Sequence, residues 1–198
     1  GDTHRALADV TNRLFCASGA DTPSIEQIAD TAGVSRRTFF RYFNSKEAAF
    51  FADHEDRLVR FEASLARRRE GEDAYGCVRR CLLELAAEYD LRRDEFVLRH
   101  RAIEASPSLI AYDLRLDRHY EEAIVSALVS DARSDEALVR ARVLGSALFG
   151  VVRAVLRPWL DDPGRTLVER GLEAFSYLEE GLRFPPRESQ RSAAAKAP

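Results

Sequence analysis

The chain of 198 residues contains no methionine, only three cysteines and, among 30 basic residues, only two lysines. A small, odd number of cysteines does not build a disulfide scaffold and fits a reducing compartment. No apolar run approaches the roughly 18 residues that a membrane-spanning helix needs. The first residues lack the charged-then-apolar layout of a secretory signal. We therefore expect a cytoplasmic protein without a membrane partner.

The sequence also lacks the motifs that carry common catalytic chemistries. No Gly-x-Ser-x-Gly, His-Glu-x-x-His or Gly-rich phosphate-binding loop occurs, and the four histidines are scattered. Cys77 and Cys81 lie one helical turn apart, but no further Cys or His completes a metal site, which favours core cysteines. Two further pairs of potential metal ligands lie one helical turn apart, His100 with Glu104 and Asp113 with Asp117. Such pairs are common on helix surfaces, so the sequence predicts no catalytic residue, no metal and no cofactor.

Apolar residues recur with helical spacing along almost the whole chain, and no segment alternates as a strand would. The fold class is therefore all-α, with about nine helices. The expected helices span residues 7–18, 24–32, 35–43, 45–69, 73–90, 92–105, 107–128, 135–159 and 165–182. We expect a DNA-binding domain over 1–46, a larger helical body over 47–184, and a polar, disordered tail over 185–198.

The segment SIEQIADTAGVSRRTFFRYFNSK, residues 24–46, has the layout of a helix-turn-helix. Gly33 can adopt the left-handed conformation of the turn, and Val34 can fill the small core between the two helices. Phe39 and Phe43, four residues apart, face inward. Residues 35–46 contain four basic and no acidic side chains, against a net charge of −3 for the chain. Local arginine with hydroxyl groups suits phosphate positioning and base contact.

Residues IEQIADTAGVSRRTFFRYFNSKEAAF, with Leu14, Phe15 and Gly19 before them, resemble the N-terminal domain of the TetR (tetracycline-repressor) family of bacterial transcription regulators. The resemblance covers about residues 5–51. The positions that match the family motif are Ile28, Ala29, Ala32, Gly33, Val34, Ser35, Thr38, Phe43, Ser45, Lys46 and Glu47. The resemblance implies a three-helix DNA-binding domain followed by a helical ligand-binding and dimerisation domain. The later helices agree with the family in number and length only.

The same resemblance assigns contacts with DNA. Arg37 stands where the family usually has Gly, which adds a guanidinium to the second helix of the motif, and Phe40 replaces the usual Tyr, so that only apolar contact remains. Phosphate contacts are expected from Thr38, Tyr42 and Lys46, and base contacts from Arg36, Arg37 and Arg41. The full expected DNA-binding set is Ser35, Arg36, Arg37, Thr38, Phe40, Arg41, Tyr42 and Lys46.

Large aromatic side chains in the helical body suggest a ligand pocket, although each of them is also an ordinary core residue. The expected ligand-binding set is Tyr89, Phe96, His100, Tyr112, Phe149 and Trp159. The stretch from Arg99 to Leu109 and the later Arg153 to Trp159 resemble the C-terminal region of the mycofactocin-type regulators in this family. Members of that group respond to fatty acyl-thioesters. The resemblance therefore implies a small apolar or amphipathic effector, with an acyl-CoA as the candidate.

Together these observations predict a ligand-responsive transcription regulator, most readily a repressor, that binds a near-palindromic operator in double-stranded DNA. We expect a homodimer through the last two helices, with small residues such as Ala141, Gly145 and Gly150 at the contact. Two alternatives remain at this stage. One is a helical protein–protein adaptor without DNA binding, and the other is a small α-helical enzyme.

Overall fold

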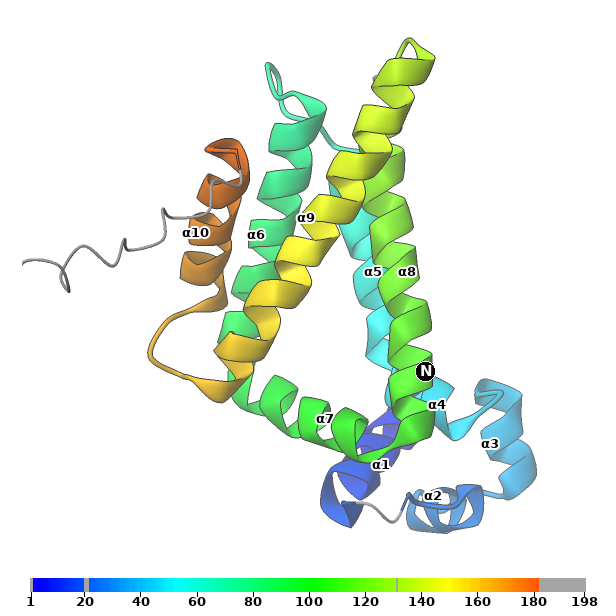
Figure 1. Ribbon diagram of the computed structural model, residues 1–198. Helices are drawn as coiled ribbons and strands as arrows, with labels where there is room; N and C mark the ends of the chain where they lie inside the picture. The colour runs from blue at the N-terminus through cyan, green and yellow to red at the C-terminus, as the bar shows by residue number, and fades with distance from the viewer. Residues whose placement is uncertain (1, 20–21, 131, 182–198) are drawn as a thin grey trace, which may run out of the picture.

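The computed structural model describes residues 2–19, 22–130 and 132–181, and these form ten α-helices (Figure 1). The prediction of an all-α fold is confirmed. The helices are α1 (Asp2–Ser18), α2 (Ile25–Thr31), α3 (Arg36–Tyr42), α4 (Lys46–Phe50), α5 (Ala52–Leu65), α6 (Ala74–Leu91), α7 (Arg93–Ala105), α8 (Pro107–Val129), α9 (Asp135–Asp161) and α10 (Leu167–Glu179). The expected tail over 185–198 lies outside the described residues. No helix of the described part is long and apolar enough to cross a membrane.

Local capping explains where most helices begin. Ser24 accepts a hydrogen bond from the backbone N–H of Gln27, and the Gln27 side chain accepts one from the backbone N–H of Ser24. Thr166 and Glu169 form the same reciprocal box at the start of α10. These boxes satisfy N–H groups that the first turn of a helix leaves unpaired. They are local signals, and they place α2 and α10 within a few residues of the prediction.

The predicted single helix over 45–69 is wrong, because the chain turns at Phe51 and the second part ends at Leu65. Phe51 ends α4 and precedes α5, with φ −96° and ψ 16°. Phe50 packs its ring against Phe15 of α1, whereas Phe51 stacks on Tyr112 of α8. The change of direction allows both consecutive phenylalanines to be buried, and it accounts for ten helices where the sequence suggested nine.

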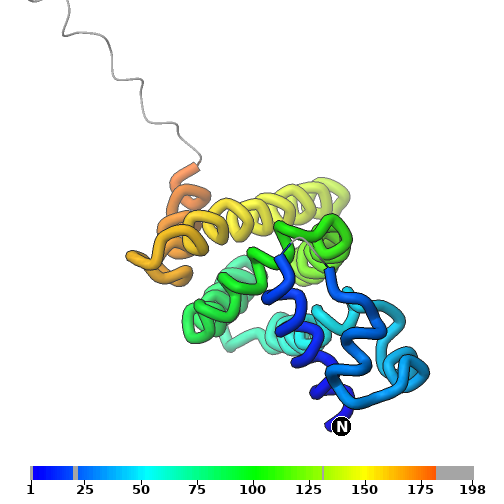
Figure 2. The backbone as a smooth tube through the Cα atoms, turned by 90° about the horizontal axis from the view of Figure 1, so that it is seen from below, coloured from blue at the N-terminus to red at the C-terminus, as the bar shows by residue number. Residues whose placement is uncertain are grey.

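The helices form two regions. In Figure 1, α5, α6, α8, α9 and α10 stand roughly upright, α7 crosses below them, and α1 to α4 lie at the lower end, with α2 and α3 outermost. Figure 2 shows α10 on the opposite side of the molecule from α2 and α3. Gly145 allows α9 to approach α8 closely, since a methyl group there would come within 2.6 Å of a Val125 side-chain carbon.

An aromatic cluster joins the N-terminal region to the body. Phe15, Phe50 and Phe51 pack with Leu109 and Leu116 of α8 in one buried cluster. Such packing transmits strain because a close-packed core has few voids to absorb displacement. A displacement of α8 in the body is therefore transmitted to α4 in the N-terminal region.

Candidate DNA-binding surface and effector cavity

Helix α3 is fixed at its start by Ser35 and buried along one side by Phe39. The Ser35 hydroxyl oxygen accepts from the backbone N–H of Thr38 at 3.1 Å and lies 2.9 Å from the Thr38 hydroxyl. Phe39 is fully buried among residues of α1 and α2. Gly33 has φ 67°, the left-handed conformation expected of the turn. The helix-turn-helix prediction is confirmed down to its turn.

The opposite side of α3 carries exposed basic and aromatic groups. Arg36 forms an ion pair with Glu26 at 2.6 Å, with both side chains largely exposed. The guanidinium of Arg41 lies 5.0 Å from the centre of the Tyr42 ring. Arg37 is exposed, and Phe40 is 44% exposed beneath the Arg36 guanidinium. Exposed ion pairs contribute little stability, so DNA can displace Glu26 from Arg36 at small cost.

Lys46 has a different environment from the arginines. Its ammonium group donates to the hydroxyl of Thr22 at 3.0 Å and to the carbonyl oxygen of Pro23 at 3.1 Å. It therefore holds the segment before α2 against the start of α4. A phosphate contact from Lys46 would extend this connection from the protein to the DNA backbone.

A cavity of about 310 Å³ lies within the helical body. Most of the predicted ligand residues line it, namely Tyr89, Phe96, His100, Phe149 and Trp159. Tyr112 does not line this cavity. It stacks on Phe51 in the cluster that joins the two regions. The volume lies at the lower end of the range for small-molecule sites.

Trp159 is fixed at the inner wall of the cavity. Its indole N–H donates to a carboxylate oxygen of Asp90 at 2.8 Å, and its exposed fraction is 0%. The same carboxylate accepts from the backbone N–H groups of Leu167 and Val168. Asp90 of α6 thus ties the end of α9 to the beginning of α10 beside the cavity.

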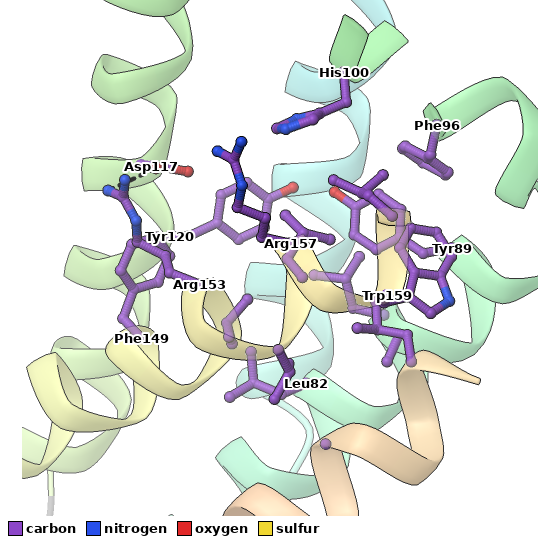
Figure 3. A pocket seen from close by; sticks show the side chains of 18 of the residues that line it. Leu82, Tyr89, Phe96, His100, Asp117, Tyr120, Phe149, Arg153, Arg157 and Trp159 are labelled. Carbon is purple, nitrogen blue, oxygen red and sulfur yellow. Dashed lines mark ion pairs between the residues drawn. The ribbon is translucent and has the colours of Figure 1, made fainter. Parts of the chain in front are cut away.

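Basic and acidic side chains pair at the solvent side of the cavity. Arg153 contacts Asp117 at 3.2 Å and Arg157 contacts Glu104 at 3.1 Å, in each case between α9 and a neighbouring helix. Both arginine side chains are more than half exposed. Figure 3 shows Arg157 directed toward His100, with Arg153 beside Asp117. An incoming anion can therefore meet two exposed guanidinium groups, one held by the partly buried Asp117 and one by the exposed Glu104.

Two titratable side chains of the cavity have strongly shifted pKa values. Burial, and then the positive charge of Arg57, lower the pKa of His54 to about 3, so its imidazole is neutral at pH 7. Burial, and then the negative charge of Asp117, raise the pKa of Asp113 to about 6. Burial also raises the pKa of Asp117. Both aspartates line the cavity, although the sequence suggested only a pair on a helix surface.

Sequence reasoning missed several lining residues, among them Arg57 and Tyr120. Arg57 is 2% exposed, and it lies four and eight residues before the buried Phe61 and Leu65. A charged residue that occupies the apolar stripe of a helix was the available signal. Tyr120 likewise follows the buried Leu116 by one turn.

The remaining candidate clusters have structural environments. Cys77 donates to the carbonyl oxygen of Leu65, and Cys81 donates to the hydroxyl of Ser64, both within the core. Burial raises the pKa of Cys77 to about 11, which disfavours a thiolate. Among residues 2–19, 22–130 and 132–181, no group of three or more His, Cys, Asp and Glu side chains is arranged to hold a metal ion.

A capped helix-turn-helix with a basic outer face, joined to a helical body with an apolar cavity, defines a DNA-binding regulator that responds to a small molecule. Residues 7–52 match the family model described as "Bacterial regulatory proteins, tetR family", and residues 72–183 match the model described as "MftR C-terminal domain". The chain belongs to the tetR family of bacterial regulatory proteins.

Individual relatives agree with this assignment. The chain is 26% identical over 184 residues to the "Putative mycofactocin biosynthesis transcriptional regulator MftR" of Mycobacterium tuberculosis, covering 91% of each chain. Among solved structures, FadR of Thermus thermophilus in complex with lauroyl-CoA is 23% identical with a TM-score of 0.57, covering 92% of this chain and 97% of that one. NalD of Pseudomonas aeruginosa, a repressor of a multidrug efflux pump, is 18% identical with a TM-score of 0.62, covering 91% and 95%. The two structural likenesses show the fold alone.

Family membership decides between the three functions that the sequence left open. The chain is a ligand-responsive transcription repressor of the tetR family that binds operator DNA and a small effector. The adaptor and the enzyme are thereby excluded, and the prediction of a DNA-binding regulator is confirmed.

Proposed function

We propose that this repressor binds a near-palindromic operator as a homodimer in the cytoplasm and releases it when an acyl-thioester fills the cavity. In this proposal residues 1–46 form the DNA-binding domain and residues 47–184 the effector-binding and dimerisation domain. The observation that carries the proposal is an apolar cavity with two arginines at its solvent side, each paired with a carboxylate, in a body that is connected to helix α3 through α4.

Helix α3 is the element that enters the major groove. The base contacts come from Arg36, Arg37 and Arg41, because a guanidinium can donate two hydrogen bonds to a guanine edge. Phosphate contacts come from Thr38, Tyr42 and Lys46, with Ser35 at the helix start and Phe40 in apolar contact. The exposure of the arginines on one side of α3 supports this division.

The DNA contacts are tested with alanine variants on a selected operator and on random DNA. Loss of a base-reading arginine such as Arg37 should cost about 1–3 kcal/mol on the operator and relax one base position. Loss of Lys46 should weaken binding to all sequences alike. If every arginine variant loses equal affinity on both DNAs, the arginines contact phosphates and not bases.

The dimer contact lies on the outer side of α9 and α10. Val139 and Val143 of α9 are 60% and 66% exposed, one turn apart, and α10 adds Leu172 and Tyr177. Of the small residues expected at this contact, Ala141 and Gly145 instead face the core of the protomer. Apolar side chains on two neighbouring helices are a surface that a two-fold axis can pair with itself.

The dimer is tested by light scattering of the unmodified protein at micromolar concentration. We expect twice the mass of the 22.3 kDa chain. Val143→Asp should return the protomer mass, whereas Val59→Asp, at an equally exposed apolar position of α5, should not. A protomer mass for the unmodified chain would refute the dimer.

The acyl chain of the effector occupies the apolar part of the cavity, and its anionic part meets Arg153, Arg157 and His100. A volume of about 310 Å³ corresponds to about ten water-sized groups. The similarity of the fold to FadR bound to lauroyl-CoA supports this class of ligand.

The effector is tested by titrating acyl-CoAs, free fatty acids and planar aromatic compounds against a fluorescent operator duplex with bound repressor. We expect acyl-CoAs to release the duplex, and Arg153→Gln with Arg157→Gln to require more ligand. Release by another class only would refute the acyl-thioester. If no compound releases the duplex, the cavity is not the effector site.

A further inference from the structure

The cavity contains buried polar atoms that the protein itself does not satisfy. These are Nε and Nη1 of Arg57, Nε2 of His54 and the hydroxyl of Tyr120, none of which has a hydrogen-bond partner among the described residues. Arg57 is 2% exposed and Tyr120 is 6% exposed. Buried polar groups in folded proteins are nearly always hydrogen-bonded, and leaving them unpaired destabilises the fold.

The three side chains lie close together on α5 and α8. The ring centres of His54 and Tyr120 are 5.1 Å apart. The guanidinium of Arg57 lies 5.5 Å from the centre of the Tyr89 ring. Figure 3 shows the hydroxyl groups of Tyr89 and Tyr120 directed toward each other across the cavity. The unpaired atoms therefore form one cluster, which faces the cavity from its inner side.

The charge of this cluster favours an oxygen acceptor. Asp53 accepts from Arg57 at 2.9 Å and from Arg99 at 2.8 Å, so one carboxylate serves two buried guanidinium groups. His54 is neutral at pH 7 and can donate through one of its ring nitrogens. An excess positive charge with free N–H and O–H donors suits an oxygen that only accepts.

Two acidic side chains of α8, Asp113 and Asp117, also line the cavity. Asp113 is seven residues before Tyr120 on α8, or about 10 Å along the helix axis. Asp117 is paired with Arg153 on the solvent side. Asp117 lies one turn before Tyr120, and its ion pair with Arg153 offsets the negative charge that it presents to an acceptor there.

We propose that Arg57, His54 and Tyr120 form a subsite for an oxygen acceptor, so that the ligand carries a carbonyl or carboxylate oxygen on its buried part. This subsite deepens the proposed function, because it specifies an oxygen-bearing group, such as a thioester carbonyl, on the part of the effector that enters the cavity. The subsite requires that the cavity is the effector site, but it does not require that the effector is a thioester.

The subsite is tested by calorimetry of the full chain without DNA, with three ligands that share a ten-carbon chain. Decanoate and 2-decanone present an acceptor, whereas decylammonium presents only donors. We expect decanoate and 2-decanone to bind at least about tenfold more tightly than decylammonium. Tyr120→Phe should weaken the two acceptor ligands about fivefold, the factor of one hydrogen bond, and leave decylammonium unchanged.

Two further variants make the test specific. Arg57→Lys keeps a positive charge beside Asp53 but removes the planar set of donors, so it should weaken decanoate as Tyr120→Phe does. Tyr75→Phe is the matched control, because the Tyr75 hydroxyl donates to Glu179 and does not line the cavity. It should change the binding of none of the three ligands.

The outcomes distinguish a failure of the subsite proposal from a failure of the acyl-thioester proposal. Equal binding of decanoate and decylammonium, absence of binding by all three ligands, or equal losses for all three in Tyr120→Phe would overturn the subsite. If acyl-CoAs leave the operator bound while the Tyr120-dependent contrast persists, the acyl-thioester is refuted and the subsite stands. If acyl-CoAs release the operator without that contrast, the effector stands and the subsite is refuted.

Discussion

Stability of this protein between pH 6 and pH 5 should depend on two partly buried side chains, His54 and Asp113, whose effects oppose each other. The pKa of His54 is lowered to about 3, so in this range acid protonates the imidazole of the unfolded chain but not of the folded one. Acid therefore favours unfolding through His54. The pKa of Asp113 is raised to about 6, so acid protonates this carboxyl in the folded protein before it does so in the unfolded chain. Acid therefore favours folding through Asp113.

The magnitudes nearly cancel. Starting from the ordinary values of 6.5 for His54 and 3.8 for Asp113, each group changes the free energy of unfolding by about 1 kcal/mol between pH 6 and pH 5. Asp113→Asn should lose about 1 kcal/mol more than the unmodified protein on this acidification. His54→Gln should gain about 1 kcal/mol relative to it.

The assay is urea unfolding followed by circular dichroism at both pH values and at one protein concentration, since a dimer makes stability depend on concentration. The exposed Asp30→Asn controls for the loss of a carboxylate. Variants of His54 and Asp113 that follow the pH dependence of the unmodified protein would show that neither side chain has the shifted pKa that its surroundings imply.

Three further outcomes are expected. Gly145→Ala should destabilise the fold by about 1–3 kcal/mol in urea unfolding, because its methyl group meets the Val125 backbone at 3.1 Å; an unchanged midpoint would contradict the close approach of α8 and α9. Tyr75→Phe should cost about 1 kcal/mol while Tyr120→Phe costs nothing, because only the first removes a hydrogen bond; equal losses in the same assay would disprove the difference. Trp159 is the only tryptophan and lines the cavity, so saturation with effector should change the fluorescence emission of the protein, and an unaltered spectrum in a ligand-bound sample would place the ligand elsewhere.

The sequence predicts elements whose signals are local. The turn at Gly33, the caps at Ser24 and Ser35 and the proline that opens α8 each depend on a few neighbouring residues, and the structure has them where the sequence puts them. The break at Phe51 was missed because it depends on contacts with α1 and α8, which lie far away in the sequence.

The cavity could be predicted only in part, because its lining depends on how each helix is rotated about its axis. The expected aromatic residues of α6, α7 and α9 line it, whereas Tyr112 on α8 stacks on Phe51. The polar lining was less visible still. Arg57 has a local signal in the apolar stripe of α5 and a partner, Asp53, one turn before it, but the second arginine that shares Asp53 is Arg99 of α7, and no local pattern reports that contact.

The sharing of Asp53 by two buried arginines constrains the order in which this protein can evolve. If Asp53 is replaced first, Arg57 and Arg99 are left as like charges in the interior, a loss that typically costs about 3–5 kcal/mol. If either arginine is replaced first, the carboxylate keeps one partner. A lineage can therefore begin to lose this trio more easily at an arginine than at the aspartate.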